Sequence, residues 1–379
     1  MTTSEAREVA ATSTVNRERG RPAVADRFVT SPRQDLVTVV LAAVMTGGLL
    51  SDAWAHTNII DTIESFFTPW HAALYSGFAA MAAWTFWLAY SRRSVTPRWW
   101  RDGWPVGYLV GALGAVGFMV GGLLDMVWHT IFGIEASLDI AFSPSHMLLS
   151  LSGTLLLTSP LRSWWATGER GLRSVTGVLS LALGTVMASI LLTTFSAFIS
   201  TAPTRSYEHI NGSPSEVAAA LGMADYLITT VVLAVPLLMV LQRRPAPGTA
   251  TALVAILALF ACTMYELPAT QTAAAVGAIA GAVLADLALH RLDTSRGRDA
   301  FLRLPLAGAV FAALVWAGHL LGIQLSAGIG WPVELWAGTV VITALLGAAL
   351  GGLAERSAPA SQPDGDDLIP KEVRTDHRR

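Results

Sequence analysis

The sequence predicts an all-α protein, a polytopic transmembrane helical bundle of about ten helices. Of its 379 residues, 53% are hydrophobic and only 14% are charged, whereas soluble domains carry roughly 25% charged residues. Long apolar runs recur, among them 36–50, 106–124 and 175–198. A hydrocarbon core about 30 Å thick needs roughly 20 apolar residues in a helix, in which every backbone polar group is bonded internally. We therefore expect a multi-pass protein of the plasma or inner membrane, with the lipid bilayer as its partner.

The apolar segments divide the chain into two membrane units between two polar tails. Residues 1–34 carry six Arg residues and no hydrophobic core, which is typical of a disordered cytoplasmic tail and not of a signal peptide. Residues 355–379 are rich in Pro, Asp and Arg and predict a second disordered tail. The units are 35–162, with four helices, and 174–354, with six. The predicted spans are 35–56, 70–91, 105–128, 145–161, 174–200, 217–241, 249–267, 269–290, 304–322 and 332–354.

Basic residues orient the predicted bundle. With ten spans, every one of the 25 Lys and Arg residues except Arg205 falls in the tails or in alternate connections. Cytoplasmic segments of membrane proteins carry the excess of Lys and Arg. Both termini are therefore predicted to be cytoplasmic.

Several function classes find no support in the sequence. The single cysteine, Cys262, excludes an intramolecular disulfide and a thiolate metal cluster. The sequence contains no Walker loop and no dinucleotide-binding glycine pattern, and its basic residues form no nucleic-acid-binding face, so no nucleic acid partner is expected.

A pattern of metal-ligand residues occurs twice in residues 35–162 and predicts a duplicated helical hairpin. Both copies read D-x3-H, then a Glu, then F-[ST]-P-x-H, with nearly the same spacing between equivalent positions. The first copy contains Asp52, His56, Glu64 and His71, and the second contains Asp125, His129, Glu135 and His146.

The spacing places these side chains at one membrane depth. Residues i and i+4 share a helix face, about 6 Å apart, and Thr68-Pro69 and Ser143-Pro144 are typical of a helix cap followed by Pro at the first helical position. Each hairpin therefore brings one carboxylate and two imidazoles to the outer interface. Two His and one carboxylate form a ligand set for copper, iron or zinc. Glu64 and Glu135 are candidate accessory or supporting ligands, or exposed loop residues.

Other interpretations of the same residues stay open. Ionisable groups in membrane spans can form a proton or ion relay, and a histidine near the membrane surface can simply be an interfacial packing residue. The D-x3-H spacing alone is a weak motif, because Asp286 and His290 repeat it at the cytoplasmic end of the eighth span, where we expect an interfacial pair.

The paired D-x3-H…H motifs over about residues 35–162 resemble the C subunit of particulate methane and ammonia monooxygenases. The resemblance implies one copper site at Asp52, His56 and His71 and a neighbouring one at Asp125, His129 and His146. This family tends to have Asn at the position of Asp125, and the present chain continues for six further predicted helices. The family also works with partner membrane subunits, so such subunits or a homo-oligomer are conceivable here.

The sequence therefore predicts a membrane metalloprotein, with copper as the first candidate metal, that could act as a monooxygenase-like oxidoreductase. The alternative is a cation or proton-coupled transporter, or a metal-handling protein, that uses the same residues. The substrate and the catalytic residues stay open, as does the choice between one shared metal site and two separate ones.

Overall fold

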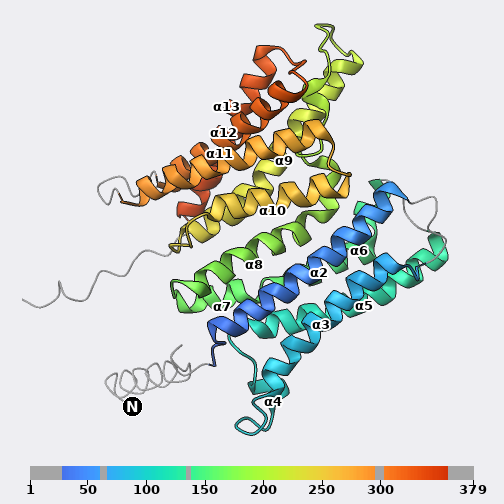
Figure 1. Cartoon of the computed structure of the whole chain (residues 1–379), viewed down its shortest axis with the longest axis vertical. Coiled ribbons are helices and arrows are strands. Elements are labelled where there is room, and N and C mark those ends of the chain that lie inside the picture. Colours follow the sequence, from blue (N-terminus) through green and yellow to red (C-terminus); the bar gives the residue numbers. More distant parts are fainter. Residues whose placement is uncertain (1–27, 60–65, 134–137, 295–302, 357–379) are drawn as a thin grey trace, which may run out of the picture.

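The computed structural model describes residues 28–59, 66–133, 138–294 and 303–356, and every regular element in these ranges is a helix (Figure 1). The α-helices are α2 (Pro32–Asn58), α3 (Pro69–Tyr90), α4 (Trp99–Asp102), α5 (Tyr108–Phe132), α6 (Pro144–Leu157), α7 (Ser159–Thr167), α8 (Leu172–Ser189), α9 (Pro214–Leu241), α10 (Thr249–Met264), α11 (Ala269–Thr294), α12 (Arg303–Ser326) and α13 (Val333–Arg356). The 3-10 helices are η3 (Leu138–Phe142), η4 (Ile190–Phe195) and η5 (Ala202–Thr204).

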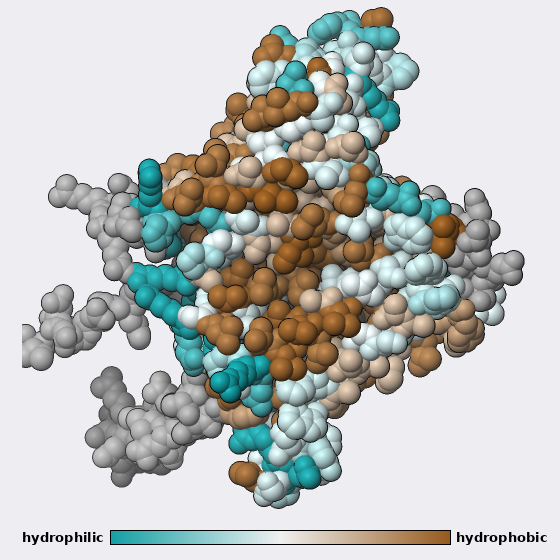
Figure 2. Space-filling model, in the orientation of Figure 1, coloured by the Kyte–Doolittle hydropathy of each residue, from teal (hydrophilic) through white to brown (hydrophobic). Residues whose placement is uncertain are grey.

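Within the described ranges, eight helices are long and apolar enough to cross a membrane: α2, α3, α5, α8 continued by η4, α9, α11, α12 and α13. Large apolar side chains lie exposed along them, such as Leu113 on α5 and Leu345 on α13, 63% and 65% exposed. Figure 2 shows such side chains over the middle of the visible face and polar ones toward its margins. This distribution suits a multi-pass protein surrounded by lipid.

The predicted fourth span, 145–161, is broken in the structure. The chain leaves the helical path at Thr158, so α6 has 14 residues and α7 follows as a separate helix. Pro160 explains the break, because it has no N–H to donate to the carbonyl of Leu156. α6 and the 16-residue α10 are shorter than the other apolar helices, so they are not among the eight candidate spans.

Most predicted boundaries move by a few residues, and two of them concern the ends of larger units. The N-terminal tail was predicted to reach residue 34, but α2 begins at Pro32, where Ser31 and Gln34 form a capping box. The fifth predicted span, 174–200, ends earlier, because η4 stops at Phe195. Residues 1–27 and 357–379, most of the two predicted tails, lie outside the described residues.

Hydrogen bonds between helix ends show that α2 begins and α13 ends on the same side of the bundle (Figure 1). At one side, the Asn58 amide donates to the carbonyl of Met264, which joins the ends of α2 and α10 (2.9 Å). At the other side, the Gln242 amide after α9 donates to the carbonyl of Ala354 on α13 (3.4 Å). The assignment of this second side to the cytoplasm stays a prediction.

A buried ion pair fastens α2 to α8 on that second side. Asp35 is fully buried and receives hydrogen bonds from Thr30 Oγ1 and Tyr108 Oη, both at 2.7 Å. Its other oxygen lies 3.1 Å from the guanidinium of Arg173, which is also buried. The Arg173 guanidinium in turn donates to Ser163 Oγ on α7 (3.0 Å). A charge pair withdrawn from solvent in this way is stable only when its polar atoms are bonded.

Glycine allows α11, α12 and α13 to pack closely. A Cβ atom added to Gly277 would collide with the backbone carbonyl of Gly318 on α12. Gly308 on α12 and Gly347 on α13 face each other in the same way. These three helices therefore form a closely packed group, and α10 packs between α11 and α2.

Candidate metal centre

The end of α2 and the start of α3 carry the first predicted ligand set. Asp52 and His56 lie in the last turns of α2. The Thr68 hydroxyl caps α3 by accepting from the backbone N–H of His71 (3.1 Å), as the Thr-Pro pair predicted. The cap holds His71 in the first turn, where its Nε2 lies 3.4 Å from Asp52 Oδ1.

The end of α5 and the start of α6 carry the second set. Asp125 and His129 lie in the last two turns of α5, and α6 begins at Pro144, as predicted. The Asp125 carboxylate contacts both histidines of the set. Its Oδ2 lies 3.4 Å from His129 Nε2 and its Oδ1 lies 3.2 Å from His146 Nε2.

The two sets meet in one contiguous cluster, and His71 joins them. The ligand atoms of Asp52, His56 and His71 all lie within 4.8 Å of one another, and so do those of His71, Asp125 and His129. The ring centroids of His56 and His71 are 5.7 Å apart. His146 contacts Asp125 but belongs to neither group of three. The hairpins therefore present a shared cluster and not two distant sites.

Backbone carbonyls fix the tautomer of three of the histidines. Each of these rings turns its Nδ1 toward a carbonyl oxygen, at distances of 2.7, 3.2 and 3.1 Å: His71 to Phe66, His129 to Gly133 and His146 to Ile140. Because a carbonyl only accepts, Nδ1 carries a proton, and a ring that is neutral keeps its lone pair on Nε2. All three Nε2 atoms point at the carboxylates. Ligand histidines are oriented in this way by a hydrogen bond from their other nitrogen.

The separations between Nε2 and the carboxylates have the size of a metal site. They are 3.2 to 3.4 Å, longer than the roughly 2.7–2.9 Å of a charge-assisted hydrogen bond. Two ligands bound at about 2.0–2.1 Å to one tetrahedral ion lie ~3.3–3.4 Å apart. Asp125, His71 and His129 are also buried, being 2%, 5% and 7% exposed. The geometry fits cation binding in a site withdrawn from water.

Two residues that the sequence did not single out, Ser145 and Phe66, support the cluster. Ser145 donates a hydrogen bond to Asp125 Oδ1 (2.9 Å) and is itself within 2.7 Å of Ser143 Oγ. The ring of Phe66 stacks on His71 with centroids 4.5 Å apart. Ser145 occupies the variable position of the F-[ST]-P-x-H pattern, where the first copy has Trp70. The repeat therefore gave no signal for it.

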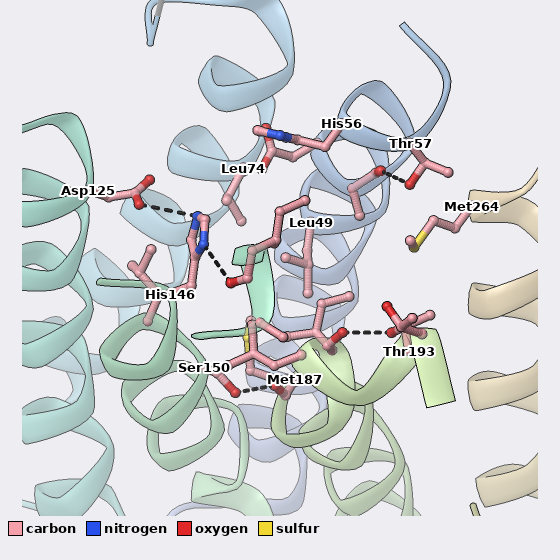
Figure 3. Close-up of a pocket in the computed structure, with 18 of the residues that line it drawn as sticks. Leu49, His56, Thr57, Leu74, Asp125, His146, Ser150, Met187, Thr193 and Met264 are labelled. Carbon is pink, nitrogen blue, oxygen red and sulfur yellow. Dashed lines mark hydrogen bonds and ion pairs between the residues drawn. The ribbon is translucent and has the colours of Figure 1, made fainter. Parts of the chain in front are cut away.

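A cavity of about 420 Å³ adjoins the cluster. Figure 3 shows Asp125 and His146 facing each other, with Leu49, Leu74 and Met187 around the same space. Most of its lining is apolar, and its polar part includes five of the six predicted ligands: Asp52, His56, His71, Asp125 and His146.

Other predicted polar residues have different places. Glu64 and Glu135 lie outside the described residues. Asp286, of the third D-x3-H, accepts from the backbone N–H groups of Ala250 and Thr251 (3.0 and 2.8 Å) and so caps α10. This carboxylate has a structural partner, so the D-x3-H spacing by itself does not mark a ligand.

Comparisons with protein-family models, with curated proteins and with solved structures found no match for this chain. The resemblance to the monooxygenase C subunit therefore rests on the motifs and stays a prediction.

Proposed function

We propose that this chain is a membrane metalloprotein that binds a transition metal where α2, α3, α5 and α6 meet. Copper is the first candidate, with iron and zinc as alternatives. The single observation that carries the proposal is the orientation of His71, His129 and His146, whose Nε2 lone pairs converge on the carboxylates of Asp52 and Asp125. These lone pairs would face negative oxygen atoms in a buried site unless a cation or a second proton on each ring lies between them.

The donor set favours these metals. Asp52, His56 and His71 would hold one ion, and Asp125 and His129, with His146, would hold the same ion or a neighbouring one. Imidazole and carboxylate ligands suit copper, iron and zinc. Copper or iron bound there would supply the capacity to activate dioxygen. If the protein is an enzyme, we therefore expect an oxidoreductase, and it would need an electron donor that partner membrane subunits could provide.

The adjoining cavity supports a reactive site over a purely structural one. Structural metal sites are closed by protein ligands, whereas catalytic sites keep an open position. Here five of the six candidate ligands line a cavity of about 420 Å³ whose other walls are mainly apolar. A small apolar molecule would fit there, next to the cluster.

The alternative function is transport of a cation or of protons through the same residues. A relay would need further acids along the bundle, and the available candidates are Asp225, Glu266 and Asp286. Asp286 is engaged as the cap of α10, which leaves the relay one candidate fewer. The metalloprotein is therefore the first proposal, and the experiment below also distinguishes it from a transporter.

Spectroscopy of the copper-loaded protein tests the proposal. We expect electron paramagnetic resonance of the full chain to show Cu(II) with imidazole nitrogen ligands, and His56→Ala and His129→Ala to lose this signal. His290→Ala is the matched control, because His290 lies near the end of α11 and outside the cluster. This variant should keep the copper signal. If all variants give the signal of the unaltered protein, the copper lies elsewhere. Metal-dependent uptake into proteoliposomes, without metal retained by the purified protein, would favour the transporter.

A further inference from the structure

A second cavity, of about 630 Å³, opens between α6, α7, α8 and α9. It extends from Met239, near the end of α9, to Leu192 in η4. Its outer wall consists of Val231, Val235 and Met239, which are 40%, 48% and 37% exposed. We call this space the α8–α9 groove. Because these wall residues are apolar and exposed, we expect the groove to open toward the bilayer.

One guanidinium, that of Arg162 on α7, lines this apolar groove. It donates only to neutral oxygens: the carbonyls of Gly107 (2.9 Å) and Leu155 (2.6 Å) and the hydroxyls of Thr158 (2.7 Å) and Ser159 (3.1 Å). Among the described residues, no carboxylate forms an ion pair with it. A charge beside apolar surface normally has a counter-ion, and four of its five N–H groups are used, so one is left for another acceptor.

A second cation stands beside the groove. The guanidinium of Arg243, just after α9, lies 4.9 Å from the ring centroid of Trp165, which also lines the groove. Tryptophan is enriched at the membrane–water interface, so the position of this ring indicates headgroup depth. The groove is therefore mainly apolar, with Arg162 in its lining and Arg243 against a ring of its wall.

We propose that the α8–α9 groove binds an anionic phospholipid. Its phosphate would lie between Arg162 and Arg243, and an acyl chain would lie along Val231, Val235 and Met239. Charge complementarity selects this occupant, because a neutral lipid would leave the Arg162 charge without a counter-ion. The predicted orientation places Arg162 and Arg243 at the cytoplasmic leaflet, where juxtamembrane Lys and Arg residues bind anionic lipids. The proposal is independent of the metal site.

Lipid retention measured by native mass spectrometry tests the proposal. The full chain, exchanged into detergent with equal amounts of phosphatidylglycerol and phosphatidylcholine, should retain phosphatidylglycerol preferentially. Arg243→Gln should weaken its retention about fivefold, the effect of one basic residue near an anionic headgroup. Val235→Trp, which fills the groove, should abolish it. Arg162→Gln should also weaken it, but this change removes hydrogen bonds within the protein as well, so the other two variants decide.

The matched control is Arg93→Gln. Arg93 follows α3 on the same side and lies 4.2 Å from the ring centroid of Tyr90, so it repeats the cation–aromatic contact away from the groove. This variant should retain the lipid normally. Equal retention of the two lipids, or equal losses in Arg93→Gln and Arg243→Gln, would overturn the proposal. Protection from thermal unfolding by inorganic phosphate as strong as that by phosphatidylglycerol would also overturn it, because it would show that the acyl chain is not recognised.

Discussion

Replacement of Ser145 by Ala should weaken metal binding without removing a ligand. Ser145 is 3% exposed, and its hydroxyl donates to the Asp125 oxygen that lies 3.2 Å from His146. The hydrogen bond orients the carboxylate. Loss of such a supporting contact typically costs 10- to 100-fold in metal affinity, or about 1.4–2.8 kcal/mol. We therefore expect the dissociation constant to rise by about one to two orders of magnitude.

Competition with a chelator of known affinity, in detergent, measures this change. Ser150→Ala is the matched control, since Ser150 lies on the same helix, is buried and donates to the backbone carbonyl of Met187 (2.7 Å) and not to a candidate ligand. Its affinity should stay within about threefold of the unaltered protein. If the two variants bind metal equally well, the Ser145 hydroxyl does not support Asp125 as a ligand.

Three further predictions concern stability, measured by thermal unfolding in detergent. Asp35→Ala removes the buried carboxylate beside Arg173, whose other ion-pair partner is the exposed Glu169, and should destabilise by about 3–5 kcal/mol. Asp35→Leu combined with Arg173→Met should recover most of this, and no recovery would contradict the ion-pair argument. Asp286→Ala removes the cap of α10 and should lower the free energy of unfolding by about 0.5–2 kcal/mol while the metal content is unchanged. A loss of metal would reassign Asp286 to the site. Gly277→Ala should destabilise the protein by about 1–3 kcal/mol because the added Cβ meets the α12 backbone. Gly338→Ala should not, because open space surrounds Gly338. Equal effects of the two variants would argue against this packing.

Local signals in the sequence predicted much of the architecture. Apolar length gave the position of the helices, and Thr68-Pro69 gave the first residue of α3 because cap and proline act within one turn. Ser143-Pro144 likewise gave the first residue of α6. The break at Thr158 was missed, although Pro160 two residues later was a visible cause.

Contacts between distant segments could not be predicted. The repeat indicated two ligand sets, but the role of His71 as the residue common to both depends on how α2 and α3 pack against α5. The contact of Asp35 with Arg173 likewise joins residues at the starts of α2 and α8. Asp286 shares the D-x3-H pattern with Asp52, and only the three-dimensional arrangement shows that it caps a neighbouring helix. Spacing identifies residues with the right chemistry, whereas packing decides which of them meet.

Elemental analysis of the purified full chain tests the central claim most directly. The protein, grown with copper, iron and zinc all supplied, should be compared with an Asp52→Ala/Asp125→Ala variant and with Asp286→Ala as the control for loss of an aspartate. We predict at least one equivalent of a transition metal, with copper first, in the unaltered protein and in Asp286→Ala, and its loss in the double variant. A folded protein that contains no transition metal, or a double variant that retains it in full, would contradict the account.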